Sequence, residues 1–61
     1  MSNNLGLHHR YNSYRVCFGP FDTVFVIASS AHNAIVYASH DHPDLVNLCK
    51  SSRRKITAVL A

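Results

Sequence analysis

Apolar and polar residues alternate near the start of the chain, where Tyr14, Val16 and Phe18 are separated by single residues. Successive side chains of a strand point to opposite faces, so these three side chains share one face of a predicted strand. Gly19 and Pro20 follow, and they favour a turn because Gly tolerates unusual backbone angles and Pro cannot continue a strand ladder. The pattern predicts the first strand and the turn of an antiparallel hairpin.

The segment 22–28 predicts a second strand that is apolar on both of its faces. In an extended chain the side chains of Phe25 and Ile27 point to one face of the strand, whereas those of Val24 and Val26 point to the other. An exposed edge strand of this composition would promote aggregation. The double-sided apolar character therefore favours a central or interface position for this strand.

A helical periodicity replaces the strand pattern after Ser29-Ser30. A serine at this point is a candidate N-cap, because its hydroxyl can accept a hydrogen bond from an amide of the first turn. The apolar residues then recur at the i, i+3, i+4, i+7 spacing that places side chains on one helical face; they are Ala31, Ala34, Ile35 and Ala38. Pro43 ends this helix, because a proline disfavours helical geometry in the residue before it.

A short second helix begins at Pro43, since proline suits the first turn and Asp44 lies near the positive helix start. Residues 56–60 alternate again and predict a third strand. This strand can lie beside the first strand, which is then central, or parallel beside the second strand. The apolar residues of the second helix are Leu45, Val46, Leu48 and Cys49.

These elements predict one domain over residues 1–61 of the α+β class. It is a small antiparallel sheet of two to three strands (β-β-α-β) packed on one main helix, with a short second helix. Residues 1–11 are polar and predict an N-terminal arm. A chain of 61 residues has helix enough to cover only one side of such a sheet. The other apolar side must meet another protein surface, a second copy or a target, so the sequence favours binding or assembly over catalysis.

The formal net charge is +3, and its distribution is uneven. Four of the six cations lie between residues 50 and 55. Such a cluster is typical of a contact with phosphate or with an acidic protein patch, although a solvated loop that keeps a protein soluble has the same composition. The predicted partner-contact residues lie on the open sheet face or edge and in this basic loop: Arg15, Val24, Val26, Lys50, Arg53, Arg54 and Lys55.

Catalytic and metal-binding motifs are sparse in this sequence. Cys17 and Cys49 form no Cys-x-x-Cys pair, and there is no glycine-rich phosphate loop. His40-x-His42, with Asp41 between, offers nitrogen and oxygen donors, but zinc needs four ligands at defined spacing. A structural role at the ends of two helices explains the same residues equally well. His42 and Asp41 would cap the second helix, and His40 would close the first. The sequence therefore predicts no enzyme activity, no metal and no cofactor.

One alternative is a small basic nucleic-acid-binding protein. The basic loop would contact phosphates, while Tyr11, Tyr14 and Phe18 would stack on bases. Against this, the aromatic residues at 14 and 18 share a face with Val16, which is the usual pattern of a core-facing strand. The chain also carries no helix-turn-helix, zinc-finger or RNA-recognition signature. A homodimeric structural or regulatory protein is a further alternative, because a free outer strand edge can pair with that of a copy.

In layout, the chain resembles the very small proteins that phages and mobile elements use to block host machinery, anti-CRISPR proteins among them. The resemblance lies in the hairpin from Tyr14 to Ala28, the segment Ser29-Ser30-Ala31-His32-Asn33-Ala34-Ile35 and the closing strand, about three quarters of the chain. It implies a stoichiometric inhibitor that binds a host protein or nucleoprotein complex and occludes its nucleic-acid or partner site. Many such inhibitors are acidic mimics of DNA, whereas this chain is basic, so its basic loop would meet an acidic surface or nucleic acid.

The expected location is the cytoplasm, that of the host cell if the protein is phage-encoded. No apolar run approaches the roughly 20 residues of a membrane helix. The first residues lack the basic-then-apolar layout of a secretory signal. We therefore expect no membrane contact.

Overall fold

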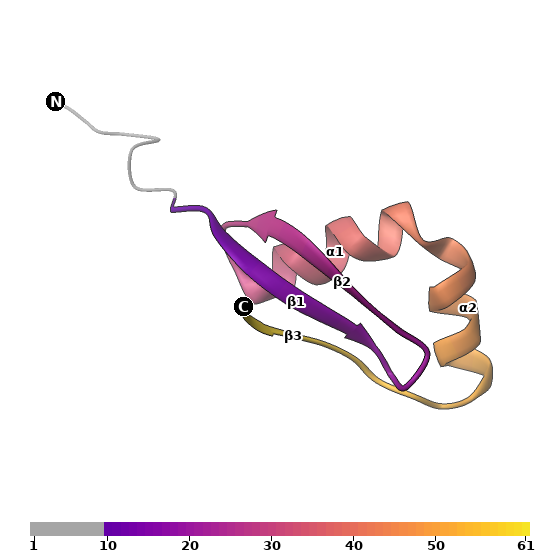
Figure 1. Ribbon diagram of the computed structural model, residues 1–61. Coiled ribbons are helices and arrows are strands. Elements are labelled where there is room, and N and C mark those ends of the chain that lie inside the picture. The colour runs from indigo at the N-terminus through magenta and orange to yellow at the C-terminus, as the bar shows by residue number, and fades with distance from the viewer. Residues whose placement is uncertain (1–9) are drawn as a thin grey trace, which may run out of the picture.

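The computed structural model describes residues 10–61, which form a sheet and two helices (Figure 1). The elements follow one another as β1 (Asn12–Phe18), β2 (Asp22–Ala28), α1 (Ala31–Asp41), α2 (Pro43–Ser51) and β3 (Ile56–Leu60). The α+β class predicted from the sequence is confirmed, with all three strands antiparallel to their neighbours and the helices packed on the sheet. The predicted N-terminal arm lies outside the described residues, except for its last two positions.

The strand order of the sheet is β2-β1-β3, so β1 is the central strand. Val16 on β1 lies opposite Val24 on β2 and opposite Ala58 on β3. Of the two placements open to the third strand, the structure has the one beside the first strand. For strand 22–28, the sequence favoured a central or an interface position; the central position is wrong, because β2 is an edge strand, and the interface position stays a prediction. The reason is that β1 carries the largest inward side chains, and a central position lets neighbours on both sides enclose them.

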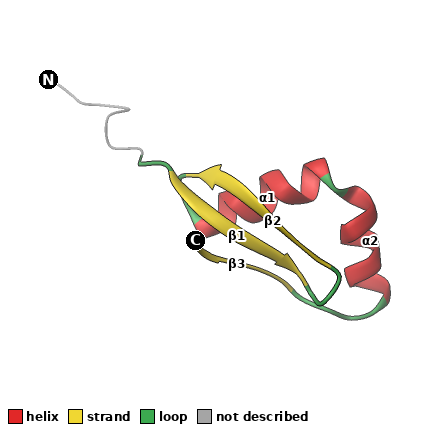
Figure 2. Cartoon of the chain, viewed as in Figure 1, coloured by secondary structure: helices red, strands yellow, loops and turns green. Residues whose placement is uncertain are grey.

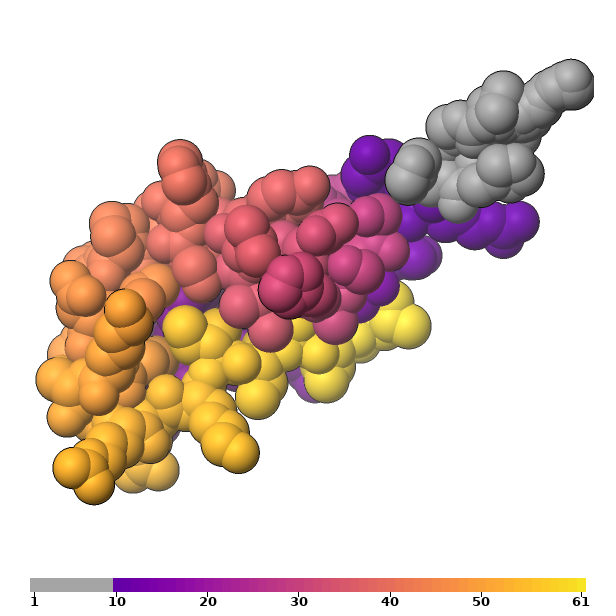
Figure 3. All heavy atoms as spheres, turned by 180° about the vertical axis from the view of Figure 1, so that it is seen from behind, coloured from indigo at the N-terminus to yellow at the C-terminus, as the bar shows by residue number. Residues whose placement is uncertain are grey.

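Both helices cover the same face of the sheet (Figure 2). Seen from behind, α1 and α2 lie in front of the strands, and β3 runs beside them as the yellow segment (Figure 3). Helix α1 packs against all three strands, and α2 packs against α1 and β1. The buried core between these layers consists of Tyr14, Val16, Phe18, Ala28, Ala34, Ala38 and Cys49.

Helix α1 approaches the sheet with the face that its periodicity predicts. Ala34 and Ala38 are fully buried, and Ala31 and Ile35 pack against the core. Small side chains at the contact let the helix axis come close to the strands. Ser30 is the N-cap of the helix, and its hydroxyl accepts a hydrogen bond from the Asn33 amide at 3.1 Å, so the predicted serine N-cap is confirmed.

The chain turns between the helices at His42, whose φ of −132° is not helical. Pro43 is the first residue of α2, as predicted from the sequence. The His42 side chain makes no capping hydrogen bond; its ring instead lies 6.0 Å from the Phe18 ring in an edge-on arrangement. Within α2, Cys49 is buried but Leu48 is exposed, so only part of the predicted apolar set enters the core.

Candidate functional site

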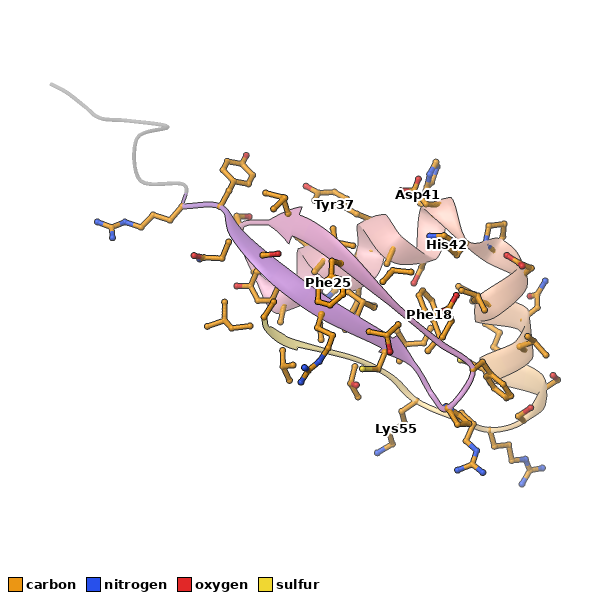
Figure 4. All side chains as sticks on the ribbon, viewed as in Figure 1. Phe18, Phe25, Tyr37, Asp41, His42 and Lys55 are labelled. Carbon is orange, nitrogen blue, oxygen red and sulfur yellow. The ribbon has the colours of Figure 1, made fainter. Side chains whose placement is uncertain are left out.

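The face of the sheet opposite the helices is uncovered. Its strand residues are the odd-numbered positions, because the even-numbered positions of all three strands point toward the helices. The register places Arg15 of the central strand directly between Phe25 and Val59, and places Ser13 opposite Ile27. Figure 4 shows Phe25 over this face and Phe18 on the side of the helices.

Three apolar side chains are exposed on this face around one arginine. The exposed fractions are 67% for Phe25, 64% for Ile27 and 46% for Val59. We call these three residues together with Arg15 the open-face patch. Residues directly opposite on neighbouring strands have Cβ atoms about 4.5–5.5 Å apart, so the patch is contiguous. Apolar groups gathered in this way on one surface are typical of a contact with another molecule.

Arg15 is the only charged side chain among the strand residues of the open face. The three acids of the chain are Asp22, Asp41 and Asp44, and none of them is at an open-face position. Within residues 10–61 the only ion pair joins His40 and Asp41, at 3.9 Å. The Arg15 guanidinium therefore has no acidic partner within the described part of the chain.

The sequence placed Val24 and Val26 on the open sheet face or edge; the open face is wrong for both, although they do lie on the edge strand β2. Both are half-buried and pack against the core. The reason is the hairpin register, which pairs them with Val16 and Tyr14, two residues of the buried face of β1. Opposite residues in a ladder share a face, so the valines follow Val16 and Tyr14 toward the helices.

The basic loop, residues 50–55, begins in the last turn of α2, which contains Lys50, and leads to β3; all four of its cations are exposed. The Arg54 amide donates to the Cys49 carbonyl at 2.8 Å, and the Arg53 amide donates to the Lys50 carbonyl at 3.3 Å. These two bonds form a Schellman motif, the helix end in which a left-handed residue, usually glycine, follows the last turn. Arg53 takes that position here, with a φ of +56°.

The basic loop is held against the hairpin turn. The Gly19 amide donates to the Lys55 carbonyl at 3.2 Å, and Gly19 itself has a φ of +53°. A Cβ at position 19 would lie only 2.7 Å from the Cβ of Arg54. The glycine is thus required twice, for its backbone angle and for the close approach of Arg54. Figure 4 shows Lys55 at this end of the sheet.

Base stacking on the buried face of the sheet is ruled out for two of the three predicted aromatic residues. Tyr14 and Phe18 belong to the core and have no surface to offer a base. Tyr11 is exposed, immediately before β1. On the sheet itself, Phe25 is the aromatic residue that faces outward.

The histidine, cysteine and aspartate side chains of the described residues do not gather at one place. Residues 10–61 form no pocket, and they contain no group of three or more His, Cys, Asp or Glu side chains arranged to bind a metal ion. Cys17 is half-buried on the open face, whereas Cys49 is buried on the core-facing side of α2, and both are free thiols. The candidate pair His40 and Asp41 is almost fully exposed at the end of α1.

The sequence prediction did not include Phe25, Ile27 and Val59, which the structure exposes on the open face. Their alternation with the core-facing positions was visible, but two apolar faces on strand 22–28 left open which one the helices cover. The pairing of Val16 with Val24 shows which face of this strand the helices cover. Val16 shares a face with the two aromatic residues of its own strand, and Val24 lies on that same face.

No match for this chain was found among protein-family models, curated proteins or solved structures. Neither of the helices in residues 10–61 has both the length and the apolar composition needed to cross a bilayer.

Proposed function

We propose that this chain is a non-enzymatic interaction module that binds another protein through its open-face patch. The observation that carries the proposal is the exposure of Phe25, Ile27 and Val59 on the side of the sheet that the helices leave uncovered. Burying these apolar side chains against a partner is favourable by roughly 25 cal/mol for each Å² of apolar surface removed from water. A patch of aliphatic and aromatic side chains around an arginine also has the composition of an interface centre.

The inhibitor role implied by the layout resemblance is one form of this function. A small module that docks by one face occludes whatever that part of its target would otherwise bind. Action on a host protein or nucleoprotein complex, and a cytoplasmic location, stay predictions of the sequence.

Selection of random displayed peptides on the immobilised protein tests the proposal. We expect enrichment on the wild type and its loss on a variant that carries Phe25→Asp with Val59→Asp, because two carboxylates would replace the apolar contact area. The matched control carries Val36→Asp with Tyr37→Asp. These α1 residues are 47% and 46% exposed and lie away from the sheet face.

The comparison of the three proteins decides the outcome. Enrichment that survives on the α1 control and disappears on the sheet variant supports the open-face patch. Equal enrichment on all three proteins, or loss on the α1 control alone, contradicts it. Circular dichroism of each variant shows whether the fold is retained, which the exposure of all four substituted side chains leads us to expect.

A second candidate function is nucleic-acid binding through the basic loop. Its four cations are all exposed, and the chain contains no acid after Asp44. Cations placed in this way would contact successive phosphates, and association would release the counterions that screen them. A contact with an acidic protein patch has the same electrostatic basis, so binding of oligonucleotides themselves must be measured to tell the two apart.

Binding of oligonucleotides by Arg53→Glu with Arg54→Glu tests this second function. We expect weaker binding and a smaller salt slope, by about 0.9 for each lost contact to duplex DNA and about 0.7 for single strands. The fold should be retained, since Arg54 touches the hairpin turn through its Cβ and Cγ, atoms that glutamate also has. Fluorescence anisotropy at several salt concentrations measures both quantities. A flat salt dependence would contradict phosphate contacts by the basic loop.

A further inference from the structure

The charge pattern of the open-face patch restricts what can cover it. Arg15 lies at the centre, with Phe25 on one side and Val59 on the other. Both flanking side chains are apolar, so a partner that buries them also removes the guanidinium from water. Desolvating an arginine without a hydrogen-bond acceptor is strongly unfavourable, and a bound partner must therefore supply an acceptor.

A second copy of this chain fits the patch poorly. Packing two copies face to face would bring two Arg15 side chains into the same apolar interface. The open face of the copy carries no carboxylate to pair with either of them. Like charges in a buried interface oppose association, so the charge pattern disfavours self-docking through this face.

Nucleic acid is also a poor occupant of this face. A single-strand binder tracks the backbone with several cations and stacks bases on several aromatic rings. The strand positions of the open face offer one cation, Arg15, and one aromatic ring, Phe25. The rest of the face is Ile27, Val59 and small polar or thiol side chains, which offer nothing to a run of phosphates.

We infer that the open-face patch binds a protein surface in which a carboxylate lies among apolar side chains, and that this carboxylate pairs with Arg15. The inference rests on the proposed function and adds the chemistry of the partner. A guanidinium presents two parallel N–H groups to the two oxygens of a carboxylate, and a bidentate pair of this kind adds geometric specificity. The apolar neighbours on both sides exclude water from the pair and so strengthen it.

Peptide selection with variants at position 15 tests this inference. Peptides enriched on the wild type should contain Asp or Glu next to apolar residues. Their affinity, measured by calorimetry, should fall at least about tenfold on Arg15→Gln, as expected for a charged residue at the centre of an interface. Arg15→Lys should recover only part of the loss, because an ammonium lacks the planar fork. The control Arg10→Gln lowers the net charge equally at an exposed position before β1, outside the open-face patch and the basic loop, and should leave affinity unchanged.

A selection repeated on Arg15→Glu provides the second readout. It should enrich peptides that carry Lys or Arg in place of the acid. Enriched peptides without acids, or equal affinity for wild type and Arg15→Gln, would overturn the inference while leaving a docking function through Phe25 and Val59 intact. Failure to enrich any peptide that depends on Phe25 and Val59 would overturn the proposed function itself. Oligonucleotide binding or self-association that Arg15→Gln changes would assign the patch to nucleic acid or to a second copy, against the inference.

Discussion

Arg53 has the least favourable backbone conformation among the described residues. It is the only non-glycine residue of 10–61 with a positive φ. The left-handed region brings Cβ close to the following carbonyl oxygen and costs roughly 1–2 kcal/mol for a residue with a side chain. The Schellman motif requires that geometry, and glycine is the residue that usually supplies it. Arg53 therefore lowers the stability of the fold relative to a glycine at the same position.

Replacing Arg53 by glycine should stabilise the protein. We expect the free energy of unfolding to rise by roughly 0.5–1 kcal/mol, because the gain in backbone geometry exceeds the entropy that glycine loses on folding. Urea denaturation followed by circular dichroism measures the change. The control Arg53→Ala removes the same charge but keeps Cβ, and it should give no gain. Equal stability of the glycine and alanine variants would contradict a backbone origin.

At the scale of the element, the start of α1 is held by side chains that precede it. The Ser30 hydroxyl accepts from the Asn33 amide at 3.1 Å, and the Ser29 hydroxyl accepts from the Asn33 side-chain amide at 2.9 Å. The first contact satisfies a backbone N–H that has no partner within the helix. The second joins two side-chain groups that water can also satisfy.

Removing the N-cap should therefore cost more than removing its neighbour. We expect Ser30→Ala to lower the free energy of unfolding by about 1 kcal/mol, the usual loss for this substitution at an N-cap. Ser29→Ala should have a smaller effect. Thermal and urea unfolding of both variants provide the measurement, and a larger loss for Ser29→Ala would show that the entry to α1 depends on the side-chain pair instead.

At the scale of the whole molecule, the two faces of one sheet have opposite roles. The helices enclose one face, where Phe18 is fully buried between the sheet and the His42 ring. The other face leaves Phe25 two-thirds exposed. The same residue type thus contributes to stability on one face and is available for binding on the other.

Alanine substitutions at the two phenylalanines should separate these roles. A chain of 61 residues has a free energy of unfolding of roughly 3–9 kcal/mol. Phe18→Ala should remove about 3–5 kcal/mol of this and leave much of the protein unfolded. Phe25→Ala should cost less than about 1 kcal/mol. Chemical denaturation tests both values. A large loss of stability for Phe25→Ala would mean that the outward face is part of the core.

The pattern of apolar and polar residues predicted the strands and helices well, because the direction of a side chain within an element depends on residues close by in the sequence. Alternation placed Tyr14, Val16 and Phe18 on one face of a strand, and the structure buries all three. The alanine spacing predicted the contact face of α1, and Pro43 predicted the break between the helices. Each of these inferences uses residues at most a few positions apart, where side-chain direction follows directly from backbone geometry.

The sequence by itself determined which segments form strands and helices, the bounds of β2 and β3, the starts of α1 and α2, and which side chains of β1 and α1 point inward. Only the tertiary structure decided that β1 is central, that Val24 and Val26 face the helices, and that Phe25, Ile27 and Val59 are exposed around Arg15. The physical reason is that a strand with two apolar faces has no local preference between them. The choice is made by strand pairing and by the position of the helices, which join residues far apart along the chain.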